Sequence, residues 1–266
     1  MKQLAKALCF CIAGIVFLCI AAAMRALSFL LNLPAHSIMA YTTQLWAKVM
    51  CMIVGVSVSV KGKNNLQNEN AMLLVSNHLS YIDIIVVASV LPSLFVAKKE
   101  VQFWPLLGWL ARMGGTIFVD RAVFRGGIAA ANEVVKALQL NTNVHIFPEG
   151  TSSNGETVLQ FKPSLFAASL IAKVPVLPLT IRYPSIDGKL FSEENRDIVC
   201  WYGNMEFTGH FLRMLQCKKI EALVTIHQPI IPSTFSTPQS LAFQAYAVVA
   251  SSFQSNKITL LQKEAG

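Results

Sequence analysis

The chain has 266 residues, of which 54% are hydrophobic and 14% are charged, and its formal net charge is +8. Because soluble proteins carry roughly 25% charged residues, this composition excludes a disordered or collagen-like chain and indicates a globular domain that also contacts a membrane. The length suits one α/β domain with an appendage. The positive charge favours an anionic partner, either a phospholipid surface or a substrate with phosphate groups. It is spread along the chain without a nucleic-acid-binding motif, so no nucleic-acid partner is expected.

The six cysteines include no C-x-x-C pair. They predict neither a disulfide framework nor a zinc site, and we interpret them as buried free thiols in a reducing compartment. The zinc motif H-E-x-x-H is also absent from the sequence, and no metal ion is expected.

Residues 1–54 are expected to form a pair of membrane-anchoring helices. The 18 residues between Lys6 and Arg25 carry no charge and would span roughly 27 Å as a helix. A second segment after Pro34 has the spacing of an amphipathic helix, with Lys48 on its polar side. Two arrangements fit this pattern. One is a hairpin at the membrane interface, and the other is a single membrane span followed by a helix of the core. We favour retention over cleavage as a signal peptide, because another apolar stretch follows Arg25 at once.

Residues 55–266 are expected to form one α/β domain. Short apolar runs predict strands, and longer runs predict helices. The expected strands are residues 56–60, 71–75, 94–97, 116–119, 144–147, 176–183, 198–202 and 222–227. The expected helices are residues 82–91, 101–113 (as one or two short helices), 126–140, 165–172 and 241–253. Strands that alternate with helices predict a mostly parallel central sheet flanked by helices.

Polar residues follow the strand expected at 71–75. Asn77, His78 and Ser80 come first, and Asp83 lies five residues after His78. If the turn folds back, the Asp83 carboxylate accepts a hydrogen bond from one imidazole nitrogen, which fixes the tautomer and leaves the other nitrogen available as a base. The alternative for such a spacing is an ordinary structural histidine at a strand end.

Two more strand ends carry polar residues. A Phe-Pro-Glu-Gly-Thr block at 147–151 follows a buried strand, at the edge where open α/β sheets place ligands. The strand expected at 116–119 ends in Asp120 and Arg121. The arginine suits a phosphate, whereas a surface ion pair between these two residues is the alternative. A Val-Pro-Val-Leu-Pro segment at 174–178 leads into the next expected strand.

Together, in this order and spacing, these four segments resemble the glycerolipid acyltransferase family, which includes 1-acylglycerol-3-phosphate acyltransferases and related lysolipid acyltransferases. The resemblance covers residues 70–182, and loosely an N-terminal helix pair. It implies that His78 and Asp83 form a catalytic dyad that acts without an acyl-enzyme. The residues expected to bind substrate, with Lys98 added as an anion partner, are Asn77, Ser80, Lys98, Phe118, Arg121, Pro148, Glu149, Gly150 and Thr151.

The resemblance implies transfer of an acyl chain from acyl-CoA or acyl-carrier protein to the free hydroxyl of a lysolipid. The first candidate acceptor is 1-acyl-sn-glycerol-3-phosphate, which would give phosphatidic acid. No cofactor is expected beyond the acyl thioester as co-substrate. The expected location is the inner membrane of a bacterium, with the catalytic domain on its cytoplasmic face. Membrane phospholipids are therefore expected partners.

One position departs from the family pattern. Ser152 stands where glycerophosphate-type members commonly have an arginine, which is a candidate phosphate contact. The Thr-Ser-Ser form at 151–153, and the segment 201–205 followed by His210, resemble bacterial members, some of which acylate lyso-ornithine lipid. The alternative acceptor is therefore this aminolipid, and Lys98, Lys99 and Arg121 remain as anion partners in either case.

Two other classes of function are considered. One is a lipid-binding membrane protein without activity, which the intact His78 and Asp83 argue against. The other is a lipid hydrolase that uses the same dyad with water as the acceptor. The absence of G-x-S-x-G and of the nucleotide-binding glycine motifs argues against an α/β-hydrolase and a nucleotide-binding protein.

Overall fold

A single β-sheet runs through the centre of the molecule. The computed structural model describes residues 2–66, 70–120 and 128–264. Within them the strands form one sheet in the order β1-β8-β6-β2-β5-β3-β4, with β7 beside β6. The strands are β1 (Val56–Lys61), β2 (Leu73–Ser76), β3 (Leu94–Lys98), β4 (Ile117–Val119), β5 (Val144–Ile146), β6 (Val176–Ile186), β7 (Lys189–Leu190) and β8 (Ile220–Ile226).

The sheet is mostly parallel, as predicted. Only the pairs of β6 with β8 and of β6 with β7 are antiparallel among the described strands. Every residue of β2 is buried, because a parallel sheet of this kind is covered by helices on both faces. The carboxyl ends of β2, β3, β4 and β5 therefore share one edge of the sheet.

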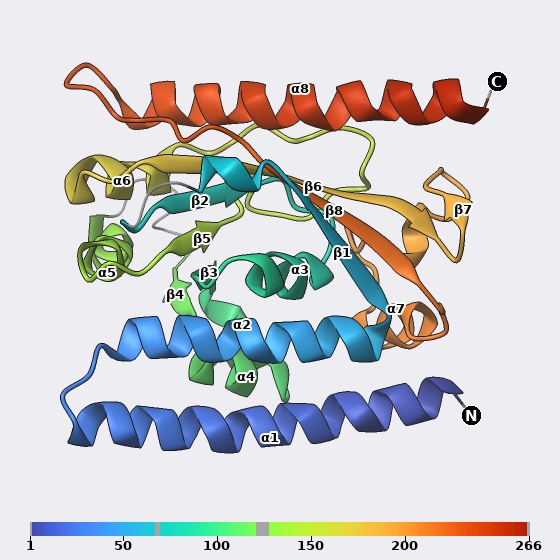
Figure 1. Cartoon of the computed structure of the whole chain (residues 1–266), viewed down its shortest axis with the longest axis horizontal. Coiled ribbons are helices and arrows are strands. Elements are labelled where there is room, and N and C mark those ends of the chain that lie inside the picture. Colours follow the sequence, from blue (N-terminus) through green and yellow to red (C-terminus); the bar gives the residue numbers. More distant parts are fainter. Residues whose placement is uncertain (1, 67–69, 121–127, 265–266) are drawn as a thin grey trace.

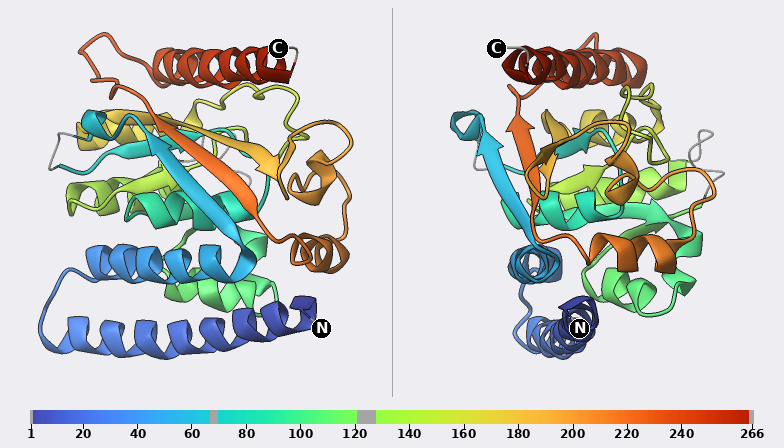
Figure 2. Two further views of the ribbon diagram at one scale, coloured as in Figure 1. Left: turned by 45° about the vertical axis from the view of Figure 1, so that its right-hand side comes forward. Right: turned by 90° about the vertical axis from the view of Figure 1, so that its right-hand side faces the viewer.

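Helices form layers above and below the sheet (Figures 1 and 2). One long helix, α8 (Pro238–Glu264), covers one face. On the other face lie α3 (Ile82–Val90) and α2 (Ala35–Val54), and α1 (Lys2–Leu30) runs antiparallel to α2 as the outermost layer. The remaining helices are α4 (Leu107–Met113), α5 (Ile128–Gln139), α6 (Ala167–Ala172) and α7 (Phe207–Met214).

The largest correction to the predicted elements lies between β7 and β8. The strand predicted at 198–202 is wrong: a 3₁₀ turn at Arg196–Ile198 leads into an irregular segment. Val199 and Cys200 are buried, which explains the apolar run. The backbone N–H of Trp201 donates to the carbonyl of Leu79 (2.9 Å), so this segment packs on the loop after β2 instead of joining the sheet. The structure also adds α7, which the apolar pattern did not predict.

The α1–α2 hairpin is fixed to the rest of the fold by polar contacts. The Lys6 ammonium donates to the carbonyls of Val54 (3.0 Å) and Cys217 (2.6 Å). At the other end of α1, Arg25 donates to the carbonyl of Arg112 (3.1 Å). These contacts tie α1 to the C-terminal ends of α2 and α4, where backbone carbonyls lack helical partners, and to the loop after α7.

The two helices of this hairpin differ in burial. Met39, Ala47 and Met50 of α2 are buried in the same hydrophobic core as the sheet. Over residues 3–30 of α1, only 17% of its most apolar window is buried, and this helix is long and apolar enough to cross a membrane. The boundary expected after residue 54 stays a prediction, and a deletion that spares the core must end before Ala35.

The exposed surface of α1 also corrects the prediction about the cysteines. Cys51, Cys200 and Cys217 are buried, whereas Cys9, Cys11 and Cys19 of α1 are exposed. Their apolar surroundings in the sequence belong to a helix face that no other part of the described chain covers. The large apolar side chains exposed on α1 are Leu4, Leu8, Ile12, Ile15, Val16, Ile20, Leu27, Phe29 and Leu30.

Candidate active site

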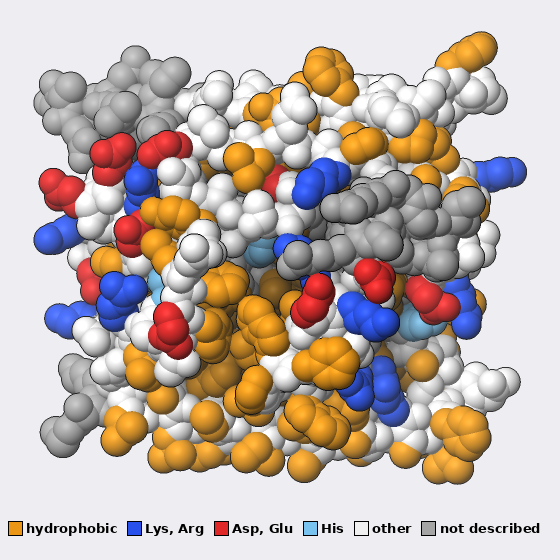
Figure 3. All heavy atoms as spheres, turned by 180° about the vertical axis from the view of Figure 1, so that it is seen from behind, with side chains coloured by type: hydrophobic (Ala, Val, Ile, Leu, Met, Phe, Trp, Pro, Cys, Tyr) orange, Lys and Arg blue, Asp and Glu red, His pale blue; other side chains and the backbone are white. Residues whose placement is uncertain are grey.

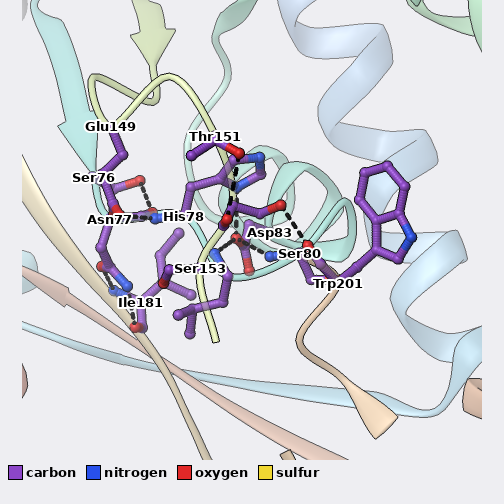
Figure 4. A network of polar contacts seen from close by, with 12 residues as sticks. Ser76, Asn77, His78, Ser80, Asp83, Glu149, Thr151, Ser153, Ile181 and Trp201 are labelled. Carbon is purple, nitrogen blue, oxygen red and sulfur yellow. Dashed lines mark hydrogen bonds and ion pairs between the residues drawn. The ribbon is translucent and has the colours of Figure 1, made fainter. Parts of the chain in front are cut away.

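The loop between β2 and α3 folds back on itself. Asp83 is the second residue of α3, and its Oδ2 accepts a hydrogen bond from Nδ1 of His78 (2.8 Å). The same oxygen accepts from the backbone N–H groups of Leu79 (2.6 Å) and Ser80 (2.9 Å). Asp83 is fully buried, so these donors stabilise a carboxylate that water does not reach. Figure 4 shows this arrangement from close by.

The His78 ring lies between the buried carboxylate and solvent. It stacks on Phe147, with the ring centroids 3.9 Å apart. Its side chain is 18% exposed, and its Nε2 makes no hydrogen bond to any residue that the structure describes. With Nδ1–H directed at Asp83, Nε2 carries the lone pair and is the nitrogen that can accept a proton.

Glu149 holds the backbone around His78. Its Oε1 accepts from the N–H of His78 (2.7 Å), and its Oε2 accepts from the N–H of Leu159 (3.0 Å). The N–H of Ser153 donates to the carbonyl of His78 (2.9 Å). Burial raises the pKa of Glu149 to about 8. The Phe-Pro-Glu-Gly-Thr block thus lies directly against the loop that carries His78.

Asn77 and Ser80 are also buried, in different polar environments. The Asn77 amide donates to the carbonyl of Ile181 (2.9 Å) and accepts from its N–H (2.8 Å). This pair continues the contact between β2 and β6 beyond the last residue of β2. The Ser80 hydroxyl is buried without a hydrogen-bond partner among the described residues. Substrate binding by either residue stays a prediction.

The turn at 148–151 brings a lysine to the site. Gly150 has a φ of +72°, a backbone conformation that favours glycine. A Cβ at this position would lie 2.6 Å from Nζ of Lys162, so the lysine side chain crosses the glycine. Pro148 is buried and its carbonyl accepts from the N–H of Lys162 (2.9 Å), whereas the Thr151 side chain is exposed.

The other predicted binding residues lie farther along the same edge. Lys98 ends β3, and Phe118 is a half-buried residue of β4 that pairs with Ala97 of β3. In the sheet order, β3 and β4 are two and three strands from β2, or roughly 10 and 14 Å at strand spacing. Arg121 lies outside the described residues, and its role stays a prediction.

Two contacts at this site were not predicted from the sequence. The hydroxyl of Tyr183, on β6, donates to Oδ1 of Asp83 (2.5 Å). The Ser152 hydroxyl donates to the carbonyl of Trp201, so the side chain at this position holds the irregular segment after β7. Neither contact has a local signal, because each joins positions far apart in the chain. In the sequence, the segment 201–205 and His210 indicate only a resemblance to bacterial members of the family.

An apolar surface connects this part of the molecule with α1. Figure 3 shows hydrophobic side chains gathered on the face seen from behind, and they continue to the edge formed by α1. Phe103, before α4, and Trp109, on α4, are 74% and 63% exposed. Exposed apolar area of this extent is typical of a surface that meets a membrane or a lipid.

Known proteins resemble parts of this chain that range from about half to more than three quarters of its length. A family model described as Acyltransferase matches residues 57–182. A lyso-ornithine lipid O-acyltransferase from Rhizobium meliloti is 35% identical over 192 residues, which are 70% of this chain and 65% of that protein. One from Pseudomonas aeruginosa is 33% identical, over 78% of this chain and 76% of that protein. A 1-acyl-sn-glycerol-3-phosphate acyltransferase from Neisseria meningitidis is 36% identical over 48% of this chain and 50% of that protein.

A solved structure has the same fold. The 1-acyl-sn-glycerophosphate acyltransferase from Thermotoga maritima superimposes with a TM-score of 0.69 over 96% of both chains. Its sequence is 23% identical to this one. The mixed sheet and its flanking helices are therefore a known architecture.

Proposed function

Because this chain belongs to the acyltransferase family of the relatives described above, we propose that it acylates the free hydroxyl of a lysolipid. The acyl donor is a thioester, either acyl-CoA or acyl-carrier protein. The observation that carries the proposal is the 2.8 Å hydrogen bond between Nδ1 of His78 and Asp83, with Nε2 on the open side of the ring. This arrangement suits a general base. Among the described residues, no serine or cysteine side chain forms a hydrogen bond with His78 that would activate it for an acyl-enzyme.

The reaction steps follow from the positions of the His78 ring and the Asp83 carboxylate. Nε2 of His78 accepts the proton of the acceptor hydroxyl as its oxygen attacks the thioester carbonyl carbon. Asp83 stabilises the imidazolium that forms. The tetrahedral intermediate collapses with breakage of the C–S bond, and the imidazolium returns the proton to the leaving thiolate. The products are the O-acylated lipid and the free thiol.

Two acceptors fit this chemistry, and we favour lyso-ornithine lipid over 1-acyl-sn-glycerol-3-phosphate. The hydroxyl of Ser152 is engaged by the Trp201 carbonyl and supplies no cation for a phosphate. Over comparable lengths, the relatives named for the aminolipid are also 35% and 33% identical to this chain, over 70% and 78% of it, against 30% over 77% for a 1-acyl-sn-glycerol-3-phosphate acyltransferase from Saccharomyces cerevisiae. Lys98 and Arg121 remain as anion partners for either head group.

Membrane association follows from the apolar outer face of α1. We propose that α1 and α2 lie as a hairpin at the cytoplasmic face of a bacterial inner membrane. The lysolipid then reaches His78 without withdrawing its acyl chain into water, which would cost about 0.8 kcal/mol for each CH₂.

Substitution of the dyad tests the proposed reaction. The change His78→Ala should lower the rate of lysolipid-dependent thioester consumption by about 10³-fold, and Asp83→Asn by about 10²- to 10⁴-fold, because both changes remove or misorient the base. The assay is run with and without lysolipid, using purified full-length protein whose fold is checked by circular dichroism. The control is His36→Ala on α2.

The outcomes separate the possible functions. Thioester loss without any lysolipid would identify a hydrolase, and no thioester loss in the native protein would indicate a lipid-binding protein without activity. Normal transfer by a folded His78→Ala protein would contradict the mechanism.

A further inference from the structure

The buried carboxylate of the dyad has a partner outside its own loop. Oδ2 of Asp83 receives the three donors of the β2–α3 loop, whereas Oδ1 receives the hydroxyl of Tyr183 at 2.5 Å. Tyr183 is 2% exposed and Asp83 is fully buried. The contact therefore joins two side chains that are 100 residues apart and excluded from water.

The position of Tyr183 follows from how β6 extends beyond its neighbour. β6 pairs with β2 from Val176 to Leu179, where β2 ends at Ser76. Asn77 then binds both backbone groups of Ile181, which fixes β6 against the loop that carries His78. Two residues later, Tyr183 reaches Asp83 from the sheet side, opposite the loop.

Burial, and then the charge of Asp83, raises the pKa of Tyr183 well above its usual value. The phenol is therefore a permanent donor. A hydrogen bond to an ionised carboxylate disperses its charge and lowers its basicity.

We infer that Tyr183 is a positioning residue, which holds the Asp83 carboxylate in place and sets how strongly that carboxylate stabilises the protonated form of His78. The inference rests on the proposed function, in which His78 is the base. A weaker phenol donor leaves more negative charge on the carboxylate, so the imidazolium is stabilised relative to the neutral ring. A stronger donor has the opposite effect.

Other titratable groups face this pair and stay constant in the comparison. They come from β5, from the turn after it, from α2 and from the segment after β7, and they are His145, Glu149, Cys51 and Cys200. Burial lowers the pKa of His145 to about 3 and raises those of Glu149, Cys51 and Cys200, that of Glu149 to about 8. All four groups are therefore neutral between about pH 3 and pH 8.

Two substitutions of the full-length protein test the inference in opposite directions. Tyr183→Phe removes the donor, and we expect kcat to fall about tenfold with KM unchanged. The acidic limb of the profile of kcat against pH should move up by about 0.5–1 unit. Site-specific replacement of Tyr183 by 3-fluorotyrosine keeps the hydroxyl but makes it a stronger donor, and the limb should move down.

The matched controls carry the same two changes at Tyr202, whose hydroxyl donates to Asp197 at the surface (2.9 Å). They should leave the limb in place. A merely structural role for Tyr183 predicts lower stability but no displacement of the limb. Coincidence of the limb in the native protein and the fluorotyrosine variant would overturn the inference, even where Tyr183→Phe fails to fold.

A second measurement does not depend on turnover. The ring nitrogen resonances of His78, assigned by their loss in His78→Gln, are titrated in the full-length detergent-solubilised protein. The midpoint of this titration should move in the same two directions as the acidic limb. An inactive native protein would contradict the proposed function alone, and an unmoved His78 titration in both variants would contradict this inference alone.

Discussion

Glu149 is a buried carboxyl group that connects two loops of the site, and its burial changes its pKa. Its carboxyl group joins the backbone of His78 to that of Leu159, while only 3% of the residue is exposed. Two backbone donors favour the ionised form, but loss of water outweighs them and the pKa rises to about 8. The residue serves as a link between two loops, and a change in its charge affects both.

The pH dependence of stability should therefore report on Glu149. Its native pKa of about 8 is above the ordinary value of 4.5, so the native state binds this proton more tightly than the unfolded state does. The stabilisation is complete below pH 4.5 and is lost as the pH rises through 8. We expect the Tm to fall by several degrees between pH 6 and about 9, corresponding to ~1–3 kcal/mol.

The comparison uses thermal denaturation of two variants. Glu149→Gln cannot ionise, so its Tm should start lower, because one acceptor is lost, and then change less with pH. Glu193→Gln changes a carboxylate that is 84% exposed and should keep the slope of the native protein. An equal slope in all three proteins would show that Glu149 does not titrate in this range.

Among the helices, α1 has an apolar outer face that the other described residues leave exposed. Phe17 and Ala21 face inward, while Leu8 and Ile15 are 61% and 58% exposed. Because α2 lies between α1 and the sheet, substitutions on the exposed outer face of α1 should leave the packing of the sheet unchanged. The apolar outer face thus has the character of a membrane contact, as proposed above.

Substitution of the outer face of α1 should separate membrane binding from chemistry. The double change Leu8→Glu and Ile15→Glu removes ~3–6 kcal/mol of apolar transfer free energy, and we expect binding to phospholipid vesicles to weaken at least tenfold. Activity on detergent-dispersed lysolipid should be retained. The control is Phe243→Glu on α8, which is 71% exposed and lies on the opposite side of the sheet (Figure 1). Equal loss of vesicle binding in both would contradict a specific role for α1.

Topology distinguishes the hairpin from a single span. A cysteine at Lys2, in a background without the exposed Cys9, Cys11 and Cys19, is treated with an impermeant thiol reagent. Protection until the cells are lysed supports the hairpin. Labelling in intact cells would mean that α1 crosses the membrane.

In the whole molecule, the layers bring the exposed apolar helix α1, the apolar surface beside it and one edge of the sheet together. The edge holds His78 and Asp83, and the segment after β7 closes one side through the Ser152–Trp201 contact. Under the proposed function, acceptor choice depends on how these parts meet a head group, because a general base does not itself distinguish one lipid hydroxyl from another.

The acceptor prediction is tested by competition between two lysolipids. We expect the native protein to have a higher kcat/KM for lyso-ornithine lipid than for 1-acyl-sn-glycerol-3-phosphate. Ser152→Arg should raise kcat/KM for the phosphate acceptor about tenfold to hundredfold, since charged hydrogen bonds to phosphate are worth ~1.5–3 kcal/mol.

The control for this prediction is Ser152→Gln. It also breaks the contact with Trp201 and has comparable length, but it lacks the charge. If both variants change the acceptor preference equally, position 152 acts through the Trp201 segment and not through charge. A native preference for the phosphate acceptor would restore the first candidate from the sequence.

The sequence by itself determined the parts whose physics is local. Alternation and apolar runs predicted most strands and helices. The spacing of His78 and Asp83 allowed their contact, and the resemblance to a known family favoured it over a structural histidine. The motif order also pointed to the family. The same local reasoning was wrong at 198–202, because an apolar run is buried equally well by a loop that packs on another loop.

Only the tertiary structure decided which distant groups complete the site. Tyr183 lies 100 residues from Asp83, and Ser152 lies 49 residues from Trp201. Their contacts depend on how far β6 extends beyond β2 and on where the segment after β7 returns. The outward direction of the α1 cysteines was decided in the same way. Hydrophobic pattern specifies which residues avoid water, but it does not specify the neighbours against which they pack, and those neighbours set the hydrogen bonds and pKa values of the site.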